Sequence, residues 1–360
     1  MLVAGLALAS LAGWLAVLLG TARAWDLRPV AEDEPAPPDP APWPSVAVLV
    51  PARNEAGVLP AALPALLAQD YPGAWHLVLV DDRSTDRTAQ AARACGVEAV
   101  PGTGLPDGWV GKVWALEQAA ARAGAPDYYL LTDADIRHAP HSLRRLVAES
   151  EARHLVLNSR MARLRCLAPA ERLLIPPFLL FFNLLYPMRR VNRRPAAAGG
   201  CMLVRRRALE EAGGFAAIRD RLIDDVGLAR LLAPHGRLRL ALSRADVESL
   251  RPHDLAGVWR MVRRTAFTQL RRSWTLLALT LALLALLFPL PPALVVFGAA
   301  TGRHVPLAAA AAAWILMTAL YLPPIRYFRL SPLWAPTLPV AGVLYGAMTL
   351  DSALRRSGEW

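Results

Sequence analysis

Two aspartates separated by one residue, Asp133 and Asp135, follow an apolar, aromatic-rich stretch at residues 128–131. That stretch predicts a short buried strand, and side chains at i and i+2 project to the same side where a strand ends. Two carboxylates held together repel each other unless a cation lies between them. A hard divalent ion, bound by one or two carboxylates and completed by substrate phosphates, meets that need. The alternative is a solvated strand end before a helix, since residues 141–148 have a helical pattern.

Polar residues also follow two earlier apolar stretches, in SVAVLVPARNEAG and HLVLVDDRST. Strands that alternate with helices predict βαβ units and a mainly parallel sheet. Ligands of such sheets bind at the carboxyl ends of the strands, so we expect these residues to share one crevice with the aspartate pair. They are Arg53, Asn54 and Glu55 after the first strand, and Asp81 and Asp82 after the second. No G-x-G-x-x-G sequence follows the first strand, which disfavours a dinucleotide-binding fold.

Lys112 and a pair of glycines are further candidates for ligand contacts. Lys112 is the only lysine among the 40 basic residues and stands near the start of a predicted helix. A lysine there can bind phosphate oxygens together with the helix N-terminus, although a surface lysine with a solvated ammonium group explains it equally well. Gly199 and Gly200 would let the backbone approach a ligand closely, and a plain turn is the equal alternative.

The pair Asp224 and Asp225 begins an amphipathic helical pattern. Acids at a helix start complement the helix dipole, which is one interpretation. The other is that one carboxylate acts as a general base. The basic amphipathic stretch at 263–274 is either a positive-inside anchor or a site in which Gln269, Arg272 and Trp274 provide polar and stacking contacts.

The composition predicts a membrane protein with one large polar domain. Hydrophobic residues make up 55% of the 360 residues, and the mean hydropathy is +0.30. Uncharged runs that reach the ~20 residues needed for a membrane-spanning helix occur at residues 1–22, 275–302, 305–325 and 330–350. We therefore expect an N-terminal anchor (1–22), a Pro-rich linker (23–44), a polar domain (45–274) with an interfacial segment at 173–188, and a C-terminal membrane region of about three helices (275–350). Prolines within 275–302 leave open whether that run is one kinked span or a span and a loop.

The net charge of +11 comes with clusters of arginine. Nucleic acid could explain such clusters, but in a chain with spanning helices the positive-inside rule and anionic lipid headgroups explain them better, so no nucleic-acid partner is expected.

The arginines that follow the first apolar run place the polar domain in the cytoplasm. A cleaved signal peptide is the alternative, because residues 22–24 resemble a cleavage site, but the run lacks a basic n-region. The three cysteines are scattered without metal-ligand spacing, which argues against a disulfide framework or a zinc site.

Seven motifs carry a resemblance to a known family: PARNE, VDDRSTDRT, GWVGKVWAL, LLTDAD, GGCMLVRR, IDD and QLRRSW. Together they resemble the family 2 glycosyltransferases, whose GT-A fold is a Rossmann-like α/β domain that binds nucleotide sugars. More narrowly, the chain is similar to the hopene-associated glycosyltransferases of bacterial hopanoid gene clusters, over residues 46–274 and in its flanking apolar runs. The resemblance implies a multi-pass enzyme of the bacterial inner membrane that transfers a sugar, with inversion, to a hydroxyl group of a lipid, such as a hopanoid.

The resemblance also implies roles for individual residues. The donor would be bound by Pro51, Arg53, Asn54, Glu55, Asp81, Asp82, Lys112 and Asp133, and a Mg²⁺ or Mn²⁺ ion by Asp133 and Asp135. Asp225 would be the catalytic base. The acceptor side would comprise Gly199, Gly200, Cys201, Asp224, Gln269, Arg272 and Trp274. Asp224 stands where relatives often have Glu. Ser273 interrupts the Q-x-x-R-W motif of processive synthases, so we expect a single transfer.

Three other functions fit parts of the sequence. A polyprenyl phosphate or a diacylglycerol as acceptor would produce much the same membrane signals. A membrane nucleotide-binding or transport protein would not need the Asp224–Asp225 pair. A nucleotidyltransferase of similar fold is usually soluble and carries a Gly-rich basic loop after the first strand, which this chain lacks.

Overall fold

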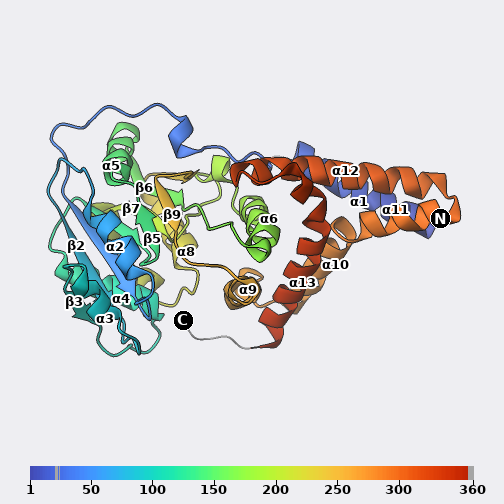
Figure 1. Ribbon diagram of the computed structural model, residues 1–360. Coiled ribbons are helices and arrows are strands. Elements are labelled where there is room, and N and C mark those ends of the chain that lie inside the picture. Colours follow the sequence, from blue (N-terminus) through green and yellow to red (C-terminus); the bar gives the residue numbers. More distant parts are fainter. Residues whose placement is uncertain (21–22, 24, 356–360) are drawn as a thin grey trace. The chain divides into compact units, whose positions relative to one another are not determined.

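The computed structural model describes residues 1–20, 23 and 25–355, so part of the expected anchor (21 and 22) and residue 24 of the expected linker lie outside the described residues. The described residues form two compact units (Figure 1). The α/β unit consists of Arg28–Arg165 and Met188–Arg251. The helical unit consists of Met1–Leu27, Cys166–Pro187 and the segment from Pro252 onward, as far as these are described.

A seven-stranded sheet forms the centre of the α/β unit, in the order β3-β2-β1-β4-β7-β6-β8. Its strands are β1 (Val46–Ala52), β2 (Trp75–Asp81), β3 (Ala99–Pro101), β4 (Tyr128–Thr132), β6 (Leu155–Met161), β7 (Cys201–Arg205) and β8 (Arg237–Leu242). Strand β7 runs antiparallel to its neighbours β4 and β6, and the other neighbouring pairs are parallel. The prediction of a mainly parallel sheet is therefore confirmed.

Helices cover the sheet and connect its strands. They are α2 (Leu59–Leu67), α3 (Thr88–Ala94), α4 (Gly111–Arg122), α5 (Ser142–Arg153), α7 (Arg206–Glu211) and α8 (Asp224–Leu232), with the short helices η1 (Ala31–Asp33), η2 (Met188–Arg190), η3 (Phe215–Ile218) and η4 (Ala233–His235). A second, two-stranded antiparallel sheet pairs β5 (Ile136–His138) with β9 (Val247–Ser249).

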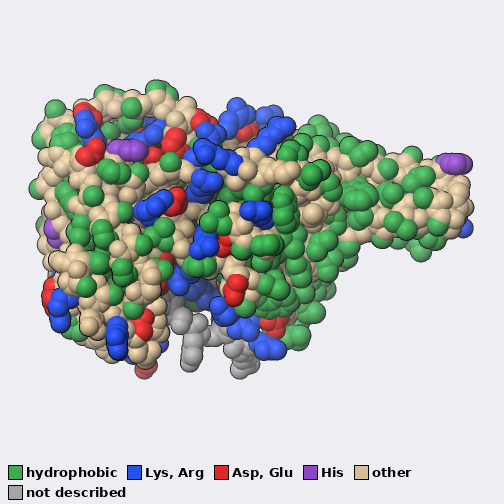
Figure 2. Space-filling model, viewed as in Figure 1, with side chains coloured by type: hydrophobic (Ala, Val, Ile, Leu, Met, Phe, Trp, Pro, Cys, Tyr) green, Lys and Arg blue, Asp and Glu red, His purple; other side chains and the backbone are tan. Residues whose placement is uncertain are grey.

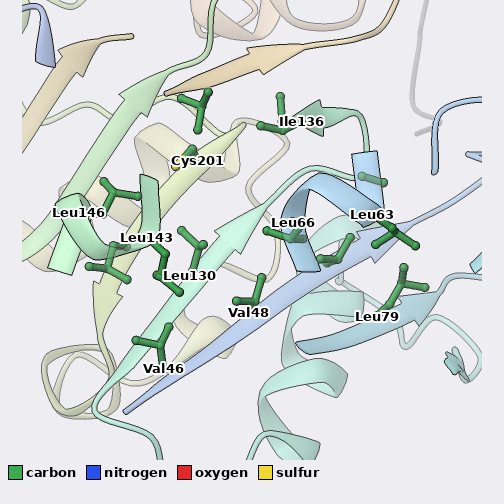
Figure 3. Close-up of a cluster of buried hydrophobic side chains, with 14 of the residues drawn as sticks. Val46, Val48, Leu63, Leu66, Leu79, Leu130, Ile136, Leu143, Leu146 and Cys201 are labelled. Carbon is green, nitrogen blue, oxygen red and sulfur yellow. The ribbon is translucent and has the colours of Figure 1, made fainter. Parts of the chain in front are cut away.

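The hydrophobic core of this unit explains the apolar strands (Figure 3). Every residue of β1 is buried, as expected for a central strand that is covered on both faces. Val46 and Val48 of β1 and Leu130 of β4 belong to the same buried cluster as Leu63 and Leu66 of α2. This packing fixes the positions of the central strands, and the strands in turn position the loops that follow them.

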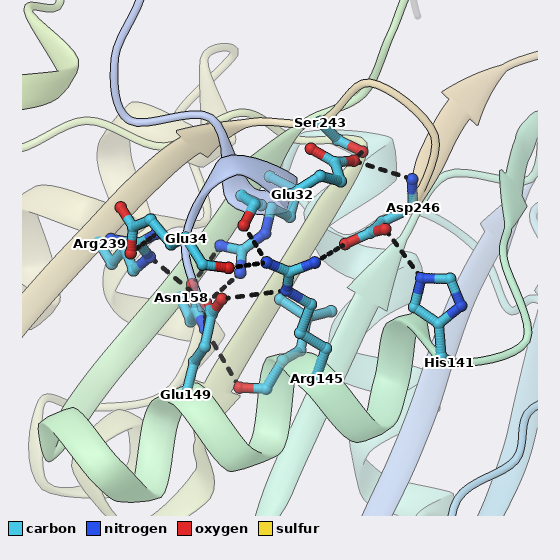
Figure 4. Close-up of polar contacts among 12 residues, drawn as sticks. Glu32, Glu34, His141, Arg145, Glu149, Asn158, Arg239, Ser243 and Asp246 are labelled. Atoms are coloured by element: carbon cyan, nitrogen blue, oxygen red, sulfur yellow. Dashed lines mark hydrogen bonds and ion pairs between the residues drawn. The ribbon is translucent and has the colours of Figure 1, made fainter. Parts of the chain in front are cut away.

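Residues 23–44, expected to be an extended linker, are held by the α/β unit from Arg28 onward. The carboxylate of Glu32 accepts hydrogen bonds from the Ser243 hydroxyl at 2.9 Å and from the backbone N–H groups of residues 244–246 at 2.7–3.1 Å. Beside it lies a buried ionic network in which Arg160 pairs with Glu149, and Arg145 contacts Glu149 and the backbone oxygen of Ala31 (Figure 4). This part of the expected linker is therefore held against the α/β unit by polar contacts.

The helical unit contains α1 (Leu2–Leu19), α6 (Pro169–Leu185), α9 (Leu255–Gln269), α10 (Trp274–Leu287), α11 (Leu290–Thr301), α12 (His304–Tyr327), η5 (Pro332–Thr337) and α13 (Leu338–Leu354). Helices α1 and α11 both pack along α12. Figure 2 shows hydrophobic side chains covering these three helices, and Leu2, Val296 and Ile315 are each at least 69% exposed. Helix α6, which includes most of the expected interfacial segment, packs against α12 and α13.

Three of the described helical segments are long and apolar enough to cross a membrane: Leu2–Leu19, His304–Tyr327 and Pro332–Leu354. Helices α10 and α11 pass the same test together but are bent by 43° at the break between them. The run at 275–302 is therefore a bent pair of helices, and Pro289 is the N-cap of the second helix. A proline there fits, because it cannot continue the preceding helix but is compatible with the start of a new one.

Candidate functional site

The predicted strand-end residues lie at one edge of the sheet. The parallel strands β1, β2 and β4 end there, and the antiparallel strand β7 begins there, with Thr132 opposite Cys201. The backbone N–H of Asp82 donates to Ala52 O at 2.8 Å, and that of Asp133 donates to Gly200 O at 3.4 Å. Topology alone thus brings together four segments that are up to about 150 residues apart in sequence.

Hydrogen bonds of Asn54 connect the loop after β1 to the loop after β2. This residue has a left-handed backbone, with φ of 57°, which Asn tolerates better than most residues. Its N–H donates to Ser84 Oγ at 2.9 Å, and its side-chain oxygen accepts from Thr85 N at 2.8 Å. The fully buried Asp82 lies 3.7 Å from an Arg53 guanidinium nitrogen and 3.2 Å from Arg83 Nε.

An arginine that the sequence did not suggest, Arg251, joins Glu55 to the aspartate pair. One of its guanidinium nitrogens lies 2.5 and 2.7 Å from the two carboxylate oxygens of Glu55, and its Nε lies 3.5 Å from Asp135. Asp135 also accepts a hydrogen bond from Ser249 Oγ at 2.7 Å. Burial raises the pKa of Glu55, an effect that Arg251 opposes. Neither Arg251 nor Ser249 belongs to a recognisable sequence motif. The pairing of β9 with β5 brings them to this edge of the sheet.

Lys112 lies at the centre of the candidate site. Its Nζ is 2.7 Å from Asp133 Oδ1 and 3.2 Å from Asp224 Oδ2. Burial disfavours a charged lysine, but the surrounding carboxylates outweigh burial and raise the pKa of Lys112 well above its usual range. A Cβ atom on Gly199 would lie 3.2 Å from Lys112 Nζ and 3.5 Å from Asp225 Oδ2. Glycine at this position therefore leaves room for the ammonium group.

Asp225 faces the same cluster from the start of α8. Its Oδ2 accepts from Gly199 N at 3.0 Å, and its Oδ1 accepts from Val226 N at 2.7 Å. Burial and the negative charge of Asp224 raise its pKa to about 7. A carboxylate with this pKa can accept a proton near neutral pH and stay protonated once it has done so. The neighbouring Asp224 Oδ2 is buried and has no hydrogen-bond partner other than its ion-pair contact with Lys112.

The chemistry of Asp133 and Asp135 fits a divalent metal ion. Both offer the carboxylate oxygens that Mg²⁺ and Mn²⁺ prefer. The described residues contain no group of three or more His, Cys, Asp or Glu side chains placed to hold a metal ion. Two carboxylates therefore make only part of a coordination shell, and donor phosphates would supply further ligands, as is usual for Mg²⁺.

Two candidates of the α/β unit are buried within the fold. Pro51 is a buried residue of β1. Cys201 is fully buried in the same hydrophobic cluster as Val48 and Leu130, and burial raises the pKa of its thiol to about 12. Its side chain is thus neutral and directed into the core, so the glycine pair before it provides the contacts at the sheet edge.

The remaining candidates, Gln269, Arg272 and Trp274, belong to the helical unit. Gln269 is the last residue of α9 and accepts a hydrogen bond from the Tyr186 hydroxyl. Arg272 has a left-handed backbone with φ of 55°. Trp274 begins α10, is 59% exposed and lies against Phe267 with 5.3 Å between ring centroids.

Comparison with known proteins shows which families and structures this chain resembles. Residues 47–213 match the model of glycosyl transferase family 2. A stretch of 106 residues is 34% identical to 4,4'-diaponeurosporenoate glycosyltransferase of Staphylococcus haemolyticus. A stretch of 119 residues is 35% identical to an N-acetylglucosaminyltransferase of Mesorhizobium japonicum. These matches cover 29% and 32% of this chain, and the chain spans 28% of the length of each of these two curated relatives.

The structure is also similar to that of the mannosyltransferase PcManGT from Pyrobaculum calidifontis in complex with GDP-Man and Mn²⁺. The TM-score is 0.61, with 22% sequence identity, over 97% of this chain and 99% of the other. At that identity the likeness concerns the fold. Residues 47–213 are thus similar in sequence to glycosyltransferase family 2, and the structure shares the GT-A fold of that mannosyltransferase.

Proposed function

We propose that this protein transfers a sugar from a nucleotide-sugar donor to a hydroxyl group of a membrane lipid, with inversion at the anomeric carbon. The observation that carries the proposal is the cluster at the sheet edge, in which Lys112, Asp133, Asp224 and Asp225 lie within contact distance of one another or of Gly199. The family match supports the reaction class.

The positions of the residues at the sheet edge support a role for each of them in binding the donor. The nucleoside would be bound by Asp82 and Arg53 and by the loop after β1, which contains Asn54. Pro51 and Asp81, at the ends of β1 and β2, would lie beside it. Lys112 would bind the diphosphate, and Asp133 and Asp135 would hold the divalent ion. When bound, that ion supplies positive charge beside the departing diphosphate. Glu55, which accepts a hydrogen bond from Arg251, would also contact the donor.

Asp225 acts as the base in this proposal. Its carboxylate takes the proton of the acceptor hydroxyl, and the hydroxyl oxygen attacks the anomeric carbon on the face opposite the diphosphate. The bond from that carbon to the diphosphate oxygen breaks, and the nucleoside diphosphate leaves with the bonding electron pair. A single displacement inverts the configuration. Gly199 N holds the carboxylate in place through its 3.0 Å hydrogen bond.

Several features favour a lipid as acceptor. Three described helical segments are long and apolar enough to cross a membrane, and a curated relative is named for its action on 4,4'-diaponeurosporenoate. We therefore propose a multi-pass protein of the bacterial inner membrane with a cytoplasmic catalytic unit, and a lipid with a free hydroxyl group, such as a hopanoid, as acceptor. A diacylglycerol, or a polyprenyl phosphate that would accept the sugar on a phosphate oxygen, is the alternative. Gln269, Arg272 and Trp274, with Gly200 and Asp224, would serve the acceptor side.

The test uses the full chain purified in detergent, a panel of radiolabelled UDP- and GDP-sugars, and a membrane lipid extract, with and without Mn²⁺ or Mg²⁺. The proposal predicts metal-dependent release of nucleotide together with label in the organic phase for one donor. Tight nucleotide binding without release of nucleotide from any donor would favour a membrane nucleotide-binding protein without transferase activity, and would refute the proposal.

A further inference from the structure

Lys112 forms an ion pair with a carboxylate that a bound metal ion would also need. Its ammonium group bridges Asp133 and Asp224 at 2.7 and 3.2 Å. Asp133 is one of the two proposed metal ligands, so a divalent ion would compete with the ammonium group for the same carboxylate. Among the described residues, Lys112 is the cation that forms an ion pair with Asp133.

The charges of the site favour a cation in this position. Five carboxylates gather there, and two cations pair with them, Lys112 and Arg251. The carboxylates are Glu55, Asp133, Asp135, Asp224 and Asp225. A divalent ion and a diphosphate bring opposite charges, so their joint arrival leaves the net charge of the site nearly unchanged, whereas either one alone changes it by about two units.

We propose that Lys112 is an exchangeable counter-ion that couples metal binding to donor binding. Without donor, its ammonium group neutralises Asp133 and weakens the affinity of the site for a free divalent ion. When the metal and the nucleotide diphosphate bind together, the ammonium group leaves Asp133 and pairs with the diphosphate. The inference rests on the proposed function and adds to it the reason why metal and donor bind as a pair.

The two cations of the site differ in a way that suits this exchange. Lysine is a compact point charge on a flexible stem, whereas arginine is a planar fork that binds carboxylates with two nitrogens. Lys112 makes one contact with each of its partners and lies beside Gly199, where no side chain restricts it. Arg251 contacts both carboxylate oxygens of Glu55 as well as Asp135. We therefore expect Lys112 to move and Arg251 to stay.

The experiment is a titration of Mn²⁺, followed by electron paramagnetic resonance, into the full chain in detergent with and without UDP or GDP. The variants are Lys112→Met, which removes the charge, Lys112→Arg, which keeps it, and Arg251→Gln, which removes the positive charge beside Glu55 and Asp135. Because we expect Arg251 to stay in place, its loss should change Mn²⁺ affinity equally with and without nucleotide. In the wild type we expect the nucleoside diphosphate to tighten Mn²⁺ binding by about tenfold or more, a typical coupling between two sites. Reciprocal tightening of nucleotide binding by Mn²⁺ is required by linkage.

In Lys112→Met we expect Mn²⁺ to bind about tenfold more tightly than in the wild type without nucleotide, and the coupling to fall to about twofold. Arg251→Gln also removes a positive charge, but its coupling should match that of the wild type. Lys112→Arg should keep the weak binding of free Mn²⁺. Thermal unfolding of each variant shows whether it is folded.

Unchanged affinity for free Mn²⁺ in Lys112→Met, or equal loss of coupling in Arg251→Gln, would overturn the inference while leaving the proposed function standing. Absence of both nucleotide and Mn²⁺ binding in the wild type would instead refute the proposed function, and the inference with it.

Discussion

Replacement of Asp225 by Asn tests the proposed base with little change in shape. The amide oxygen of Asn can still accept one of the two backbone hydrogen bonds that Gly199 and Val226 donate, but an amide does not accept a proton at neutral pH. A positioned general base contributes about 10²–10⁴-fold to the rate. This range corresponds to about 3–5 kcal/mol of transition-state stabilisation, at about 1.36 kcal/mol per tenfold change in rate.

The pKa of Asp225 adds a pH dependence of defined sign. Burial and Asp224 raise that pKa to about 7, so the carboxylate is protonated, and inactive as a base, below this pH. Because kcat/KM reports the free enzyme, it should rise about tenfold per pH unit up to pH 7 and level off above it. At pH 6 it should be about one-tenth of the plateau.

The assay measures labelled lipid formed by wild type and variants between pH 5.5 and 9, at saturating metal. Asp225→Asn should lose about 10²–10⁴-fold in kcat and show no inflection near pH 7, while it still binds nucleotide. Asp224→Asn is the matched control, because it removes the neighbouring charge that raises the pKa of Asp225. Its inflection should move below pH 7.

Two results would refute this reasoning. If folded Asp225→Asn retains more than a tenth of the wild-type kcat, another group takes the proton. If the inflection near pH 7 persists in Asp225→Asn, it belongs to a different residue, and Asp225 is a helix-start acid that complements the dipole of α8.

Three further predictions concern neighbouring contacts. Arg251→Met should raise the donor KM by about tenfold with a smaller change in kcat, because Glu55 loses the partner that opposes the burial-induced rise of its pKa; steady-state kinetics over donor concentration measure this. Gly199→Ala should lower kcat while the fold is retained, since its Cβ would lie 3.2 Å from a lysine nitrogen; kinetics with circular dichroism test it. Glu149→Gln should lower stability by about 3–5 kcal/mol, because it leaves the buried Arg160 without its ionic partner; chemical denaturation of the detergent-solubilised chain measures the loss, and an unchanged unfolding midpoint would contradict the network in Figure 4.

The arrangement of the strand-end residues was predictable because it depends on topology alone. Parallel strands present their carboxyl ends at one edge, so Asp82 and Asp133 were expected at the same edge of the sheet once the alternating pattern was recognised. The glycine pair was a candidate from the sequence, but only the structure shows why it lies at that edge, because β7 runs antiparallel and brings the residues before it there.

Contacts between side chains from distant segments were not predictable. Lys112 and Asp224 are far apart in sequence, and their ion pair depends on how α4 and α8 pack on the sheet. Arg251 follows a three-residue strand whose pairing has no strong pattern. The stretch before β1 looked like a linker because acids and prolines are typical of linkers, and nothing local shows that Glu32 accepts hydrogen bonds from the backbone of residues 244–246.

The most direct test of the central claim is the structure of the lipid product formed by the wild-type chain. A donor identified from the panel would be incubated with lipid extract, and the labelled lipid would be purified and analysed by mass spectrometry and NMR. The proposed mechanism predicts one added sugar on a lipid hydroxyl, with anomeric configuration opposite to that of the donor. A product of retained configuration, or free sugar as the sole product with every lipid fraction, would contradict it.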